Sequence, residues 1–151
     1  MRPGTLPCYH TTEWNDGQVY VEDAYPNLLF AIDGEMYKLG GIETLVIGGA
    51  YSIDKLYRLT FGYGWWPDEQ PSPAIKEKVE QALDARNWKV DVVLSHTTPL
   101  KYEPVEVFLS GVDQSKVDKS TEEWLDTIEE RLDWWYSASS AHAPARQRSP
   151  G

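Results

Sequence analysis

The stretch Val46-Ile-Gly-Gly-Ala-Tyr-Ser-Ile-Asp-Lys-Leu-Tyr-Arg58, closed by Gly64-Trp-Trp-Pro-Asp-Glu69, decides how the rest of the chain is interpreted. The apolar residues 44–47 are typical of a short buried strand. Gly48 and Gly49 allow a tight turn directly after it. Polar side chains then follow at the carboxyl end of the strand, where α/β sheets place their sites. On spacing alone, the stretch is equally compatible with a plain turn, a short helix and two core tryptophans.

A second stretch of the same kind lies downstream, Val90-Asp-Val-Val-Leu-Ser-His-Thr-Thr-Pro99. Residues 89–95 are apolar on both faces in their middle, which predicts a central buried strand. The strand ends at His96, three residues before Pro99. A neutral imidazole at a strand end suits a divalent metal ion, although a histidine at this place can also be a plain core or loop residue.

Taken together and in this order, the motifs Gly-Gly-Ala-Tyr-Ser-Ile-Asp-Lys-x-x-Arg, Trp-Trp-Pro-x-Glu and Val-Asp-x-Val-Leu-Ser-His-x-x-Pro resemble the calcineurin-like metallophosphoesterases. The resemblance covers residues 1–136 and is strongest to the small bacterial and phage members. It implies an α+β fold, a β-sandwich of two sheets flanked by helices. This chain would hold an incomplete sandwich, mostly the second sheet with two main helices.

The resemblance also implies a chemistry, the hydrolysis of phosphate esters at a centre of two divalent metals (Mn, Fe, Zn or Mg). His96 matches the family's lone histidine and would be one metal ligand. The motifs Asp-x-His, Gly-Asp-x-x-Asp-Arg and Gly-Asn-His-Glu would lie upstream of Met1. Gly-His-x-His would follow Tyr136, where the chain instead reads Ser137-Ala-Ser-Ser-Ala-His142. We therefore expect a segment of a phosphoesterase with a foreign or frame-shifted tail. Such a segment would hold no metal stably and would be inactive alone, so we assign no catalytic residue.

The polar and aromatic residues after the first strand are candidates for a substrate pocket. Arg58 could bind a phosphate through two parallel hydrogen bonds, or it could pair with Asp54 four residues earlier on a helix. The candidate substrate-binding residues are Tyr51, Ser52, Arg58, Trp65 and Trp66.

Length and charge restrict the class of protein. The chain has 151 residues, enough for one domain with a core, and a formal net charge of −10. The acidic balance argues against a nucleic-acid surface. No apolar run approaches the ~20 residues of a membrane span, and the single cysteine fits a reducing cytoplasm. The expected partner of the complete enzyme is thus a phosphate-ester substrate, not a nucleic acid or a membrane.

Local patterns predict the elements. Residues 18–22, 43–47 and a hairpin formed by 28–32 and 36–39 would be consecutive antiparallel strands of one sheet.

Residues 53–59 would form a short helix, and a longer one would begin after the N-cap Ser72, with Ile75, Val79, Ala82 and Leu83 along its apolar face. Ser120-Thr-Glu-Glu123 reads as a capping box before a helix whose buried stripe comprises Trp124, Leu125, Ile128 and Leu132. A short strand or turn is expected at 105–109 and a strand from 133, with residues 137–151 a disordered tail beyond the partial domain 1–136.

Two other functions remain open from the sequence. The chain could be a non-catalytic binding module, derived from the phosphoesterase fold, that keeps an aromatic pocket or a protein-binding surface. It could also be a truncated reading frame without a function of its own.

Overall fold

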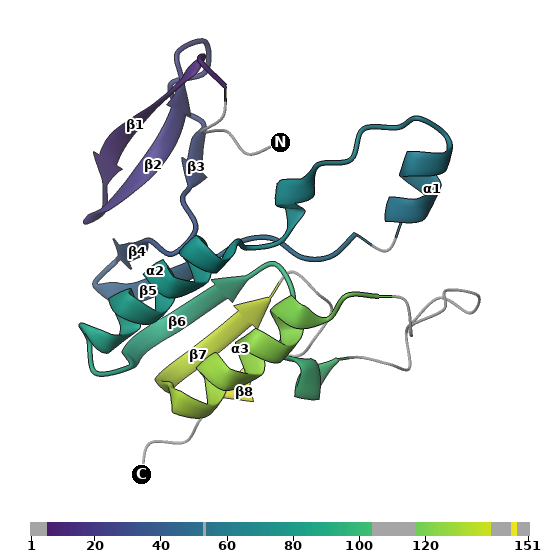
Figure 1. Ribbon diagram of the computed structural model, residues 1–151. Helices are drawn as coiled ribbons and strands as arrows, with labels where there is room; N and C mark the ends of the chain where they lie inside the picture. Colours follow the sequence, from purple (N-terminus) through teal and green to yellow (C-terminus); the bar gives the residue numbers. More distant parts are fainter. Residues whose placement is uncertain (1–5, 53, 104–116, 140–145, 148–151) are drawn as a thin grey trace.

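The computed structural model describes residues 6–52, 54–103, 117–139 and 146–147. In this part of the chain two sheets and three α-helices form an α+β fold, as the sequence predicts. The first sheet contains β1 (Tyr9–Trp14), β2 (Gly17–Glu22) and β3 (Leu29–Ala31), all antiparallel. The second has the order β4-β5-β6-β7-β8. Figure 1 shows the first sheet at one end of the second, with the two longer helices packed along the latter.

The second sheet is built around three parallel strands. These are β5 (Ile42–Ile47), β6 (Lys89–Ser95) and β7 (Asp133–Ser139). The edge strands β4 (Met36–Leu39) and β8 (Arg146–Gln147) pair with them in the antiparallel sense. The predicted strand at 89–95 is therefore confirmed, and it is central.

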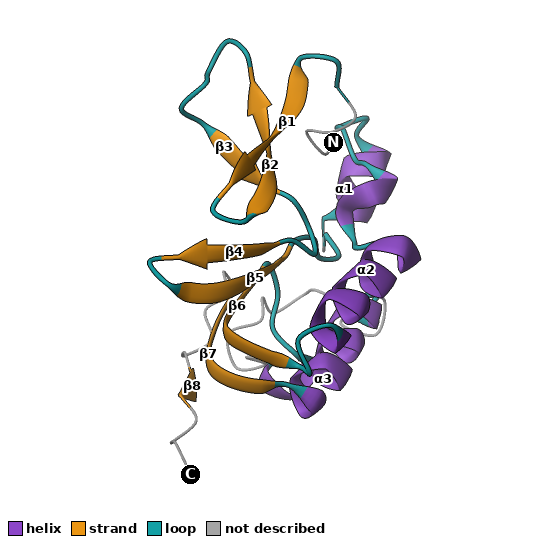
Figure 2. Cartoon of the chain, turned by 90° about the vertical axis from the view of Figure 1, so that its left-hand side faces the viewer, coloured by secondary structure: helices purple, strands orange, loops and turns teal. Residues whose placement is uncertain are grey.

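Helices lie in the connections between the parallel strands, and the two longer ones cover one face of the second sheet (Figure 2). Between β5 and β6 the chain forms the short α1 (Lys55–Thr60), a 3-10 turn (Pro67–Glu69) and α2 (Pro73–Asp84). Between β6 and β7 it forms a second 3-10 turn (Leu100–Tyr102) and α3 (Ser120–Arg131). The expected segment at 105–109 lies outside the described residues.

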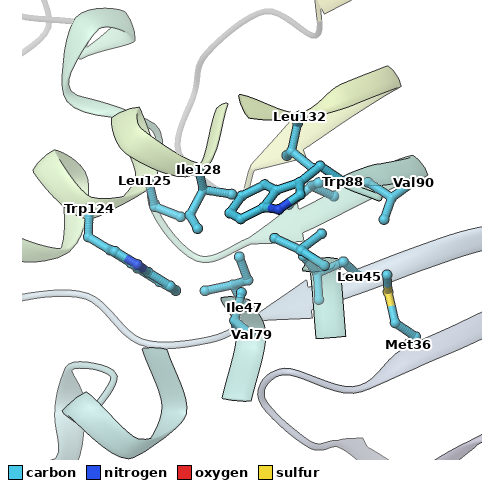
Figure 3. Close-up of a cluster of buried hydrophobic side chains, with 12 residues drawn as sticks. Met36, Leu45, Ile47, Val79, Trp88, Val90, Trp124, Leu125, Ile128 and Leu132 are labelled. Carbon is cyan, nitrogen blue, oxygen red and sulfur yellow. The ribbon is translucent and has the colours of Figure 1, made fainter. Parts of the chain in front are cut away.

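The main core lies between these helices and the sheet (Figure 3). Leu45 and Ile47 of β5 meet Val79 and Leu83 of α2, and all four side chains are at most 1% exposed. The predicted stripe of α3 is buried in the same core and comprises Trp124, Leu125, Ile128 and Leu132. The predicted stripe of α3 is thus confirmed. The predicted apolar face of α2 is confirmed at Val79 and Leu83, whereas Ile75 and Ala82 are only partly buried.

A smaller core joins the two sheets. Val19 and Val21 of β2 pack with Tyr37 of β4, which is 2% exposed. The Tyr37 hydroxyl donates to the carbonyl of Gln18 over 2.6 Å and accepts from the backbone N–H of Ile32 over 2.9 Å. Burial raises the pKa of Tyr37, so the hydroxyl stays protonated and holds both sheets in place.

The predicted hairpin of residues 28–32 and 36–39 is wrong. β3 pairs with β2, whereas β4 pairs with β5 across Gly40 and Gly41, whose φ angles of 61° and 89° form the tight turn. The N–H of Gly34 already bonds to Val46 of β5 over 2.8 Å. The Asp33–Gly34 turn therefore carries the chain from one sheet to the other, and the strands do not form a single sheet.

Three further expectations need correction. β1, which the sequence analysis did not predict, pairs with β2 through Asn15 and Asp16, both in the left-handed region. The capping box is not formed, because Ser120 is already helical and its N–H bonds to Asp118 Oδ1 over 3.0 Å. β7 continues through Ser139, past the predicted boundary at residue 136, because residues 137–139 complete the parallel ladder with β6.

Candidate functional site

The two sequence motifs meet at one edge of the second sheet. β5 and β6 are parallel neighbours in register, with Ile47 opposite Ser95. The N–H of His96 donates to the carbonyl of Ile47 over 3.1 Å, so His96 lies level with Gly48. Ser95 is buried and its hydroxyl donates to the carbonyl of Thr97 over 2.7 Å, which fixes the turn after the strand, while His96 itself is exposed. Carboxyl ends of adjacent parallel strands are where α/β sheets bind ligands.

The glycine turn after β5 is held by a side chain of the segment that leads into the neighbouring strand β4. The backbone N–H of Gly48 donates to Asp33 Oδ1 over 2.7 Å. A Cβ at Gly48 would lie 2.3 Å from that oxygen, which is too close for any side chain. Gly49 has a φ of 92°, in the left-handed region that favours glycine. The local geometry therefore favours glycine at both positions, since a Cβ at Gly48 would push the Asp33 carboxylate aside.

Beyond this turn the chain leaves the sheet and forms a projection, residues 54–66, which we call the aromatic lobe (Figure 1). Polar contacts close its base. Asp54 accepts hydrogen bonds from the Ser52 hydroxyl and from Arg58 Nε, the latter over 2.6 Å. Arg58 Nη1 also donates to the carbonyl of Gly64 over 3.2 Å. The lobe is thus closed on itself by one guanidinium.

The electrostatics of the base follow from these contacts. The Ser52 hydroxyl and then the Arg58 guanidinium hold the pKa of Asp54 below its ordinary value. The same carboxylate raises the pKa of Arg58, with a smaller contribution from Glu69. The alternative in which Arg58 pairs with Asp54 is therefore the one observed here.

Lys55 ties the candidate aromatic residues together. Its Nζ lies 4.2 Å from the centre of the Trp65 ring and 5.6 Å from that of Tyr51. Both distances fit cation–π contacts. Trp66 lies at the other side of the turn, with its ring 3.2 Å from the place of a Cβ on Gly64.

The structure thus brings Ser52 and Arg58 together around Asp54. It brings Tyr51 and Trp65 together around the next residue, Lys55. His96 belongs instead to the strand edge, where its backbone contacts β5. Lys55, whose Nζ contacts both rings, was not among the candidates, although its place in the same motif as Tyr51, four residues after it, is a signal that could have found it.

A hollow of about 440 Å³ lies beside the same glycine turn. Asp33, Gly48 and Gly49 line it together with Glu69 and Lys78. Among the described residues, Glu69 Oε2 is buried without a hydrogen-bond partner. Lys78 Nζ pairs with Glu35 Oε1 over 2.6 Å. The sequence analysis missed Asp33 because its Asp-Gly pair was interpreted only as a hairpin turn.

A metal centre needs several ligands around each ion. No group of three or more His, Cys, Asp or Glu side chains that could hold a metal ion occurs within the described ranges. His96 alone does not meet this requirement, so a metal centre here would depend on further ligands. For the same ranges, none of the helices is long and apolar enough to cross a membrane.

Comparison of the chain with protein-family models, with curated proteins and with solved structures gave no match.

Proposed function

We propose that this chain is a segment of a calcineurin-like, metal-dependent phosphoesterase. In this proposal His96 is one metal ligand, and Tyr51, Ser52, Arg58, Trp65 and Trp66 form part of the wall around a phosphate ester. The divalent metals are held only when ligands from other parts of the complete enzyme join His96. The two sheets and their covering helices are then an incomplete phosphoesterase sandwich.

One observation carries the proposal. The strands that end in the two motifs, β5 and β6, are parallel neighbours whose carboxyl ends are level, since Ile47 lies opposite Ser95. Motifs that are 47 residues apart in the numbering, Gly49 and His96, therefore reach the same edge of the sheet. If each motif resembled the family only by chance, the two strands that carry the motifs would not have to be adjacent or parallel.

The register of β7 adds support. Relatives are expected to carry Gly-His-x-His shortly after the position of Tyr136, and here Ser139 lies opposite Ser95. A histidine motif at this point of the chain would therefore reach the sheet edge beside His96. The described residues supply only His96, and we assign no catalytic step to them.

The register makes a direct test possible. We expect that the triple variant Ala138→Gly, Ser139→His, Ala141→His binds Co²⁺, with visible absorbance of a histidine-bound ion, and that adding His96→Ala weakens binding at least about tenfold. The matched control moves the pair by one residue, as Ala138→His with Ser140→His, and binds less tightly. Equal Co²⁺ affinity with and without His96 would remove His96 from the site.

Activity gives the second test. The 151-residue chain alone should hydrolyse no phosphate ester above background with Mn²⁺. The chain joined to a segment that carries the upstream Asp, His and Asn motifs, with Gly-His-x-His after Tyr136, should hydrolyse p-nitrophenyl phosphate. In that protein His96→Ala should lower turnover at least about 100-fold while the thermal transition is unchanged. Full activity of the alanine variant would contradict the proposal.

The alternative function, a non-catalytic protein-binding module, is favoured by one feature. The tip of the aromatic lobe exposes large apolar side chains, with Leu56 65% and Phe61 63% accessible. Such a surface does not contribute to phosphate chemistry but is typical of a contact with another polypeptide. A stable, monodisperse chain without phosphatase activity after the upstream ligands are supplied would support the module.

A further inference from the structure

The tip of the aromatic lobe carries an apolar surface that the proposed phosphoesterase function does not use. Five large side chains within eight consecutive residues are each more than half exposed: Leu56, Tyr57, Leu59, Phe61 and Tyr63. The rings of Tyr57 and Tyr63 are stacked at 5.8 Å, and those of Tyr57 and Phe61 lie 4.7 Å apart. The tip is therefore an ordered cluster with free outer ring surfaces.

The size of this surface is that of an interface. With about 150–250 Å² for each aromatic side chain, the exposed fractions correspond to an apolar patch on the order of 500 Å². That is at the upper end for the largest patch of a typical monomer, about 300–600 Å². It is more than half of the roughly 800 Å² that each partner buries in a standard interface, and the neighbouring backbone adds to it.

The charge distribution indicates what covers the patch. The chain carries a net charge of −10, yet residues 54–66 contain one carboxylate, Asp54, and two cations, Lys55 and Arg58. Two copies repel each other through their acidic bodies. Contact through the lobe, which projects away from the second sheet in Figure 1, brings together parts that are not acidic and keeps the bodies apart.

We propose that the aromatic lobe is a homodimer interface, with the tip of one copy packed on the same tip of a second copy about a two-fold axis. The contact is self-complementary, because a surface of ring faces, ring edges and leucines can pack offset against an identical one. This inference does not depend on the proposed enzymatic function. His96 and the residues that close the base of the lobe stay outside the contact.

The test is the mass of the full chain in solution between about 1 and 100 μM. Sedimentation equilibrium should give twice 17.2 kDa at the upper end, with reversible dissociation on dilution. The variant Leu59→Ser with Phe61→Ser should weaken association at least about tenfold, since central apolar residues dominate interface energies. At concentrations where both proteins are monomers, its thermal transition should match that of the wild type, because both side chains are exposed. The matched control, Leu28→Ser with Ile42→Ser, removes two exposed apolar residues elsewhere and should dimerise like the wild type.

A cross-link gives an independent measurement. With Cys8 replaced by serine, Thr60→Cys at the tip should form a disulfide-linked dimer faster than Ser72→Cys at the start of α2. The proposal would be overturned by a monomer at every concentration or by equal cross-linking rates of the two cysteine variants. It would also be overturned if Leu94→Thr, on the open face of the sheet, abolished the dimer while the lobe variant kept it. Binding of a monomer to vesicles of phosphatidylcholine, abolished by the lobe variant, would overturn it in favour of a lipid surface.

Discussion

The contact between Asp33 and Gly48 predicts a thermodynamic coupling between two positions fifteen residues apart. In the structure the Gly48 N–H bonds to Asp33 Oδ1 over 2.7 Å, and a Cβ at Gly48 would lie 2.3 Å from the same oxygen. Gly48→Ala must therefore displace the carboxylate by about 1 Å, which breaks the hydrogen bond. A hydrogen bond to a charged group contributes about 1.5–3 kcal/mol, whereas the clash itself is relieved when the end of the Asp33 side chain moves. We expect Gly48→Ala to lower the free energy of unfolding by about 1.5–3 kcal/mol.

The companion variants separate the clash from the backbone. Asp33→Ala should cost about 1.5–3 kcal/mol, because Gly48 N–H loses its acceptor. The double variant should be no less stable than Asp33→Ala alone, because the Cβ then meets no carboxylate. The two changes are thus non-additive by about 2 kcal/mol. The control is Gly40→Ala, where a Cβ meets nothing within 4 Å but φ is 61°. It should cost about 1–2 kcal/mol through backbone strain and should add to Asp33→Ala.

Urea unfolding followed by tryptophan fluorescence measures the wild type and the five variants, including both double variants, provided that the m-values agree. Additivity of Gly48→Ala and Asp33→Ala within about 0.5 kcal/mol would refute the reasoning, since it would mean that the carboxylate does not occupy the space beside Gly48. Strong coupling between Gly40→Ala and Asp33→Ala would refute it equally, because the effect would then be a general loss of stability of the sheet and not a local contact.

Other predictions concern the caps, the link between the sheets and the base of the lobe. Ser72→Ala should destabilise α2 by about 1 kcal/mol in thermal unfolding, whereas Ser120→Ala should be within about 0.5 kcal/mol of the wild type, because its hydroxyl does not cap α3. Tyr37→Phe should cost about 1–3 kcal/mol, since two backbone groups lose their partner. The carboxyl of Asp54 should titrate below its ordinary pKa by NMR, and Ser52→Ala should raise that pKa. Because the folded-state pKa of Asp54 is depressed, its contacts with Ser52 and Arg58 stabilise the fold above the ordinary carboxyl pKa, and this stabilisation is lost as the pH falls through the folded-state pKa. Titration of Asp54 at the ordinary carboxyl pKa would contradict these contacts.

The elements that could be predicted from the sequence are those with a strong local pattern. β6 has the predicted bounds, and α2 begins at Pro73 after the N-cap Ser72, whose side chain accepts from the Ile75 N–H. In both segments local preference and burial agree. β1 could not be found this way, because nearly all its side chains are exposed and no alternation of apolar and polar residues marks it.

The division into two sheets could not be predicted from local patterns. An Asp-Gly pair between two short apolar runs favours a hairpin, but here the N–H of Gly34 pairs with Val46, twelve residues away. The same holds for the candidate site. That Gly48 and His96 would be neighbours depends on which strands pair, and that Asp33 supports the turn depends on a contact across the sheet. Such long-range choices are decided by the packing of the whole core, which no short stretch contains.

The contacts of Arg58 restrict the part that it can take in phosphate binding. A guanidinium has five donors in a fixed plane, and here Nε binds Asp54 while Nη1 binds the Gly64 carbonyl. The edge that would bind a phosphate through two parallel bonds is thus engaged by a carboxylate. The pKa values agree with this ion pair: Ser52 and then Arg58 lower the pKa of Asp54, and Asp54 raises the pKa of Arg58. A dianionic phosphate at this edge would have to displace Asp54, and the displaced carboxylate would repel it. Within the proposed enzyme, Arg58 therefore serves to hold the lobe closed beside the strand ends, and any phosphate contact that it makes is through the remaining in-plane N–H groups of its terminal nitrogens.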